Sequence, residues 1–138
     1  MMKLFYIEDY DWYVEVYCLK PEFDSGPIRD RVAGLNIKDK DLYTIDGLLR
    51  SDRPNWGFTF SEPRERRSVM VVGPADSQSE YFNTIIHEAS HLSKHIAQRD
   101  GLDPFSEEVA YLVGDMAQSI YGGFKDRICL CCSKGGDG

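Results

Sequence analysis

A long amphipathic segment over residues 77–98 constrains this chain more than any other feature. Drawn as a helix with about 100° per residue, it places its apolar side chains together on one side: Phe82, Ile85, Ile86, Ala89, Leu92 and Ile96. Ser77 and Glu80 have the spacing of a capping box at the start, and Gly101 follows the end. The sequence therefore predicts a helix with one face in a core and the other in solvent.

The polar face of this helix carries the pentapeptide His-Glu-Ala-Ser-His at positions 87 to 91. Histidines four residues apart have Cβ atoms about 5–6 Å apart, so both rings can reach one zinc ion at about 2.0–2.1 Å. Glu88 would lie beside that ion, where it can take a proton from a water molecule as general base. The pattern predicts a Zn²⁺ site with His87 and His91 as ligands. The alternative is a solvated helix face that carries two histidines by coincidence.

A second helix is predicted from Asp103-Pro104, an N-cap followed by proline, to Gly122-Gly123. The short connection predicts that the two helices pack as an antiparallel pair. If their polar stripes face each other, the acidic pair Glu107-Glu108 is the best source of a third ligand at the height of His91. Gly114 on the same side would then let the helices approach closely.

The rest of the chain predicts strands more than helices. Residues 2–8 and 12–19 have the pattern of a β-hairpin, and residues 56–60 and 68–72 have that of two further strands. A short helix is expected at residues 27–33, and the remainder of residues 20–55 has no clear pattern. Residues 68–72 are a candidate edge strand for a bound substrate, although their apolar run fits a core strand better.

These elements predict an α+β fold, with a small mixed or antiparallel sheet packed against an antiparallel pair of helices. A single domain is expected over residues 1–128, followed by a Cys/Gly-rich tail over residues 129–138. Cys129, Cys131 and Cys132 lie in that tail, where a second metal site or lipidation is a less favoured alternative to reduced thiols.

Charge excludes several classes of partner. The chain has 16 basic and 23 acidic residues, a net charge of −7, which argues against binding to nucleic acid or to an anionic membrane. No apolar run approaches the roughly 20 residues of a membrane span. Acidic residues from Glu8 onward interrupt the apolar N-terminus too early for a signal peptide. A cytoplasmic protein is therefore expected.

The pentapeptide followed on the next helix by Glu107, with Ala110 three residues later, resembles the gluzincin zinc metallopeptidases. The stretch E-E-V-A-Y-L-V-G at residues 107–114 is also similar to small phage and bacterial proteins of this type. The resemblance implies a minimal zincin-like fold, a site of His87, His91 and Glu107 around zinc, Glu88 as general base, and a protein or peptide substrate.

Further residues are candidates for supporting roles in such a site. Tyr111 shares the side of Glu107 and is the favoured hydrogen-bond donor to a tetrahedral intermediate. His95, Glu108 and Asp115 are candidates for holding the ligands in place.

The leading prediction is thus a zinc-dependent metallopeptidase that hydrolyses peptide bonds. A zinc-binding protein-interaction module without turnover is the main alternative, because structural and catalytic sites can use the same ligands. A deformylase is a weaker one: that family has an upstream cysteine ligand in a Gly-Cys context, whereas Cys18 here follows Tyr17.

Overall fold

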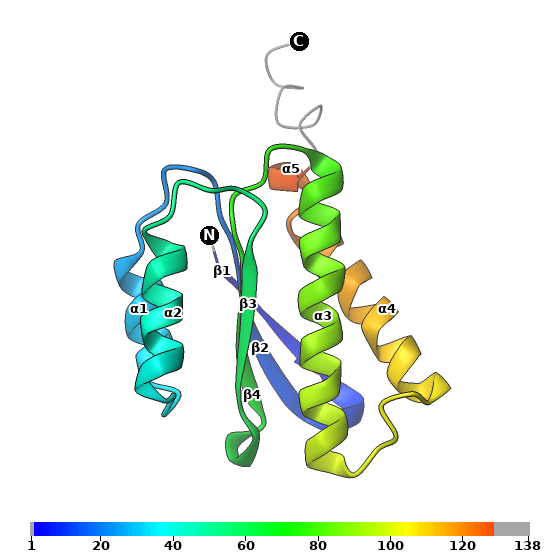
Figure 1. Cartoon of the computed structure of the whole chain (residues 1–138). Coiled ribbons are helices and arrows are strands. Elements are labelled where there is room, and N and C mark those ends of the chain that lie inside the picture. The colour runs from blue at the N-terminus through cyan, green and yellow to red at the C-terminus, as the bar shows by residue number, and fades with distance from the viewer. Residues whose placement is uncertain (1, 129–138) are drawn as a thin grey trace.

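The computed structural model describes residues 2–128, which form a mixed sheet with helices on both faces (Figure 1). The α+β fold class predicted from the sequence is confirmed. The elements in chain order are β1 (Met2–Ile7), the 3-10 turn η1 (Glu8–Tyr10), β2 (Trp12–Cys18), α1 (Gly26–Ala33), α2 (Asp39–Leu49), β3 (Gly57–Glu62), the 3-10 turn η2 (Pro63–Glu65), β4 (Arg67–Val72), α3 (Gln78–Asp100), α4 (Glu107–Gly123) and α5 (Lys125–Ile128).

The sheet consists of two antiparallel hairpins joined side by side. Its strand order is β1-β2-β4-β3, with β1 antiparallel to β2, β3 antiparallel to β4, and β2 parallel to β4. The β1–β2 hairpin and the two further strands agree with the sequence prediction. The suggestion that residues 68–72 form an edge strand is wrong, because β4 lies between β2 and β3. Side chains from Ser68 to Val72 are buried on both faces of the sheet, which is the pattern of a central strand.

Helices α3 and α4 cover one face of the sheet as the expected antiparallel pair, and α1 and α2 cover the other (Figure 1). The α1–α2 layer has its own core, which includes Ile28, Val32, Ile45 and Leu49. The sequence prediction of two layers was incomplete, because α2 was not foreseen. Only Ile45 and Leu49 of α2 are buried, so its apolar stripe is too short to stand out as a helical pattern.

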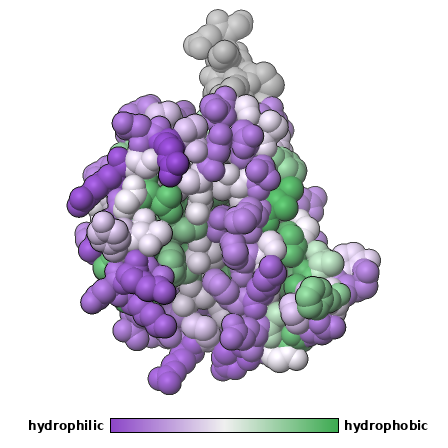
Figure 2. Space-filling view, in the orientation of Figure 1, coloured by the Kyte–Doolittle hydropathy of each residue, from purple (hydrophilic) through white to green (hydrophobic). Residues whose placement is uncertain are grey.

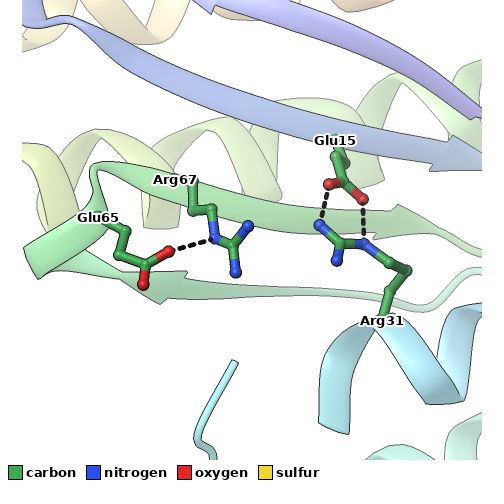
Figure 3. A network of polar contacts seen from close by, with 4 residues as sticks. All are labelled: Glu15, Arg31, Glu65 and Arg67. Carbon is green, nitrogen blue, oxygen red and sulfur yellow. Dashed lines mark hydrogen bonds and ion pairs between the residues drawn. The ribbon is translucent and has the colours of Figure 1, made fainter. Parts of the chain in front are cut away.

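An ion pair fastens α1 to the sheet. Glu15 of β2 accepts two hydrogen bonds from the guanidinium of Arg31, one of them from Nε at 2.8 Å (Figure 3). On the same face, Arg67 Nε lies 3.2 Å from Glu65 Oε2 across the β3–β4 turn. Both pairs lie on the α1–α2 side and leave the opposite face to the long helices.

The ends of α3 are where the sequence places them. The Ser77 hydroxyl accepts a hydrogen bond from the Glu80 backbone N–H at 3.1 Å, and Gly101 ends the helix in the left-handed conformation with φ 70°. Left-handed backbone is adopted most easily by glycine, which explains the sharp stop.

The start of α4 differs from the sequence prediction. Asp103 and Pro104 form a turn, in which the Asp103 side chain accepts from the Phe105 backbone N–H at 2.9 Å. Ser106 is the N-cap and accepts from the Val109 backbone N–H at 3.3 Å. Glu107 and Glu108 thereby occupy the first turn, where their charges favour the positive end of the helix dipole. Glu107 is therefore the first residue of α4 and does not lie a full turn inside it.

Within residues 2–128, no helix combines the length and the apolar character that crossing a membrane requires. The cysteines expected in a C-terminal tail, Cys129, Cys131 and Cys132, lie outside the described residues.

Candidate active site

His87 and His91 converge on the exposed side of α3. Their Nε2 atoms are 3.1 Å apart, and the two rings meet edge to face. Two nitrogens bound to one tetrahedral zinc ion at about 2.0–2.1 Å are about 3.3–3.4 Å apart, so the pair fits a shared ion after a small shift. Partial burial and the charges of His87 and Lys94 lower the pKa of His91. This favours the neutral ring that binds metals.

Glu88 lies in the contact between α3 and the edge strand β3, whereas the side chain of His87 is exposed. Glu88 is 2% exposed, and its carboxylate accepts a hydrogen bond from the Thr59 hydroxyl at 2.8 Å. Its second oxygen lies 4.0 Å from His87 Nε2. Burial raises the pKa of Glu88, and the Thr59 hydrogen bond and the charge of His87 oppose that shift. The carboxylate is thus held beside the histidine pair, and its raised pKa makes it more ready to accept a proton than an exposed glutamate is.

Gly57 allows β3 to approach Glu88 this closely. A Cβ atom at position 57 would lie 2.7 Å from Thr84 Cγ2 and 3.0 Å from Glu88 Cγ. Side chains alternate along a strand, so Gly57, Thr59 and Ser61 all lie on the face of β3 that meets α3. Sequence analysis missed Thr59 and Ser61, although this alternation in a strand beside the pentapeptide helix is a usable signal.

A chain of hydrogen bonds across the sheet holds the imidazole ring of His95 in place. Its Nδ1 lies 2.6 Å from the Ser61 hydroxyl, which lies 2.7 Å from the Ser68 hydroxyl. The indole N–H of Trp12 donates to Ser68 Oγ at 2.9 Å. Burial and the charge of His91 lower the pKa of His95. His95 thus contacts the same strand, β3, as Glu88 does.

The candidate residues of α4 lie elsewhere. Glu108 accepts a hydrogen bond from the Tyr10 hydroxyl at 2.6 Å, next to the end of β1. Tyr111 and Asp115 line the same hollow of about 460 Å³ between α4 and the β1–β2 turn. Glu107 is exposed, on the side of α4 opposite the buried Leu112 and Met116.

The two groups are at opposite edges of the sheet. The histidine stripe of α3 borders β3, and the acidic stripe of α4 borders β1. Three gaps between neighbouring strands separate those edges by about 14 Å. His95 of α3 bonds to β3 and Glu108 of α4 bonds to Tyr10 beside β1, so these polar side chains lie on the outer sides of the helix pair and not between the two helices. The sequence analysis had assumed that the stripes face each other.

This arrangement does not bring Glu107, Glu108, Tyr111 or Asp115 to the histidine pair. Among the described residues, no group of three or more His, Cys, Asp or Glu side chains is placed to hold a metal ion. Gly114 also has no role in a close helix contact, because a Cβ atom there would meet nothing within 4 Å. The spacing of the two histidines is compatible with a shared zinc ion, but no described carboxylate of α4 is grouped with them.

Comparison of the chain with protein-family models, with curated proteins and with solved structures found no match. The function is accordingly argued from the geometry of His87, Glu88 and His91 and from the strand beside them.

Proposed function

We propose that this protein is a zinc-dependent hydrolase of peptide bonds, with His87 and His91 as zinc ligands and Glu88 as general base. The observation that carries the proposal is the convergence of the two Nε2 atoms, 3.1 Å apart, beside a buried carboxylate. A zinc ion bound there would polarise a scissile carbonyl and lower the pKa of a water molecule.

Glu88 is suited to moving the proton. A general base works best when its pKa is near the working pH, and burial shifts the pKa of Glu88 upward, in that direction. Thr59 holds one carboxylate oxygen and so orients the other toward the histidine side. Once protonated, the same carboxyl group can deliver the proton to the leaving amine.

The edge strand β3 supports a peptide substrate. On the side away from β4, no described strand pairs with β3. An extended peptide can add to such an edge through backbone hydrogen bonds. Glu88 bonds to Thr59 of β3, so a peptide bound along this edge would run beside the pentapeptide, where the side chain of His87 is 67% exposed.

Zinc content and turnover test the proposal separately. His87→Ala should lose the zinc that the purified wild-type protein holds, and Lys94→Ala, on the same exposed side of α3, should keep it. Glu88→Gln should keep zinc and lose hydrolysis of an unfolded protein substrate. Equal zinc content in His87→Ala and wild type, or full turnover in Glu88→Gln, would contradict the proposal.

The same measurement decides the role of α4. Because Glu107 lies on the exposed side of α4 and away from β3, Glu107→Ala should leave zinc affinity within about threefold of wild type, in contrast to the 10- to 100-fold typical even of residues that only support ligands. A loss of orders of magnitude in a chelator competition would show that α4 turns toward the histidines.

A zinc-binding module without turnover is the second candidate. One observation bears on it: the described part of the chain groups no third donor with the two histidines, so a partner protein could supply the remaining ligands of a zinc ion held between them. Tight binding of one zinc ion by the wild-type protein, with no hydrolysis of denatured casein or of mixed peptides, would support this candidate over the hydrolase.

A further inference from the structure

We infer that a hollow beside His95 is a binding site for a carboxylate group. This hollow, the His95 hollow, lies between the end of β3 and the last turns of α3 and has a volume of about 440 Å³. Its lining consists of Phe60, Ser61, Pro63, His95, Gln98 and Arg99. In a chain with a net charge of −7, this lining contains an arginine and no acidic side chain among the described residues.

The hydrogen-bond chain behind His95 determines which ring nitrogen carries the proton. The indole of Trp12 can only donate, so Ser68 Oγ is the acceptor of that bond. Ser68 is 1% exposed, and within the described residues Ser61 is the remaining partner for its hydroxyl proton. Ser68 therefore donates to Ser61, and we assign the Ser61 proton to a hydrogen bond with Nδ1 of His95, 2.6 Å away. With Nδ1 accepting, the neutral ring carries its hydrogen on Nε2.

His95 thus presents a fixed N–H donor. A protonated Nε2 is a hydrogen-bond donor, so in this form His95 offers its Nε2–H to a ligand and does not bind zinc through Nε2. Burial and the charge of His91 lower the pKa of His95, which favours the neutral ring.

Arg99 supplies the positive charge. Over residues 2–128 it forms no ion pair within 4.0 Å, whereas its neighbour Asp100 is already bonded to Arg66 at 2.9 Å. Gln98 adds an amide donor, and Phe60 and Pro63 form an apolar wall. A planar anion that accepts several hydrogen bonds suits this set, and a carboxylate paired with a guanidinium forms such charge-assisted bonds.

The position of the hollow indicates what would carry the carboxylate. His95 follows His91 by one turn of α3, about 6 Å along the axis. An extended peptide on β3 advances about 3.3 Å per residue, so two residues bridge that distance. The group is either an acidic side chain or the free C-terminal carboxylate of a peptide. Its role in selecting a substrate rests on the proposed function, but binding itself needs neither zinc nor hydrolysis.

Three peptides test the inference in the full chain, which is freed of zinc by a chelator and then dialysed, so that no zinc-dependent cleavage occurs and no chelator carboxylate competes for the site. The first is a fully blocked pentaalanine with a central glutamate, the second has glutamine in its place, and the third is an acetylated trialanine with a free C-terminus. In an NMR titration, the first or third peptide should shift the signals of His95. It should also bind at least about fivefold more tightly than the glutamine peptide, the gain in affinity expected from one charge-assisted hydrogen bond at a partly exposed site. A preference for the first identifies an acidic side chain, and a preference for the third identifies a terminal carboxylate.

Two variants locate the site. Arg99→Gln should abolish the preference, and Lys94→Gln, which removes an exposed charge of α3 outside the hollow, should keep it. The ¹⁵N shifts of the free wild-type protein should show the Nε2–H form of His95, and Ser61→Ala should weaken that form. Equal binding of all three peptides, equal losses in the two charge variants, or an Nδ1–H form of His95 would overturn the inference. Because zinc is absent, failure here would leave the metal site untouched.

Discussion

Replacing Gly57 by alanine should destabilise the protein, because the close contact of β3 with α3 has no room for a methyl group. A Cβ atom there would lie 2.7 Å from Thr84 Cγ2, 2.9 Å from the Val71 carbonyl oxygen and 3.0 Å from Glu88 Cγ. Thr84 is buried, and the Val71 oxygen belongs to the backbone of the central strand β4, so neither can give way without moving an element. Overpacking of this kind costs about 1–3 kcal/mol of unfolding free energy.

Gly114→Ala is the matched control. Gly114 lies in the interior of α4, is exposed, and offers open space for a Cβ atom. Alanine in a helix interior is more favourable than glycine by about 0.5–1 kcal/mol, so this variant should be more stable than wild type.

Urea denaturation followed by tryptophan fluorescence measures both effects, since Trp12 and Trp56 are buried and lie on opposite sides of the sheet. The midpoint should fall for Gly57→Ala and rise for Gly114→Ala with little change in slope. The displaced Glu88 should also reduce any turnover of Gly57→Ala. If Gly57→Ala proves as stable as wild type, β3 does not press against α3 as described, and the orientation of Glu88 loses its basis.

Two further predictions concern α4. Ser106→Ala should lower the free energy of unfolding by about 1 kcal/mol, and Asp103→Ala should lower it by less, because Ser106 caps the helix. Thermal or urea denaturation measures both changes. A larger loss for Asp103→Ala would show that the helix starts at Asp103. The hydrogen bond to Glu108 raises the pKa of Tyr10 from its usual 10.0 to about 12, so its stabilising contribution is complete below pH 10 and is lost as the pH rises through about 12. In an ultraviolet titration of tyrosinate, wild type should have one more late-titrating tyrosine than Tyr10→Phe; identical curves would rule out the bond.

The sequence predicts local features well where neighbouring residues decide them. Ser77 and Gly101 bound α3 as expected, because a cap depends on residues within one turn. The start of α4 was placed at Asp103, since an Asp-Pro pair and a Ser-Glu-Glu triplet both qualify as helix starts.

In the candidate site too, the residues whose positions depend on one helix were predicted, and those whose positions depend on contacts between elements were not. The placement of His87, Glu88 and His91 follows from the period of one helix, and the structure keeps them together. The expected position of Glu107 depended on how two helices rotate relative to each other. That rotation is set by the sheet beneath them, and the helical pattern of either segment contains no information about it. Thr59 and Ser61 were missed for the same reason, since their contacts with α3 join residues about 30 positions apart.

The parallel pairing of β2 with β4 has a consequence for how the protein folds. Each hairpin is local and can form early, but the ladder between them closes only after the chain has completed residues 19–66, which contain α1, α2 and β3. Contacts of such long range slow folding, because chain entropy is lost before the pairing energy is gained. Trp12 and Ser68 lie on opposite sides of this ladder, and their hydrogen bond begins the chain that fixes His95. The hydrogen-bond chain that orients His95 is therefore complete only when the two hairpins are joined, so the order of this part of the site depends on a long-range contact.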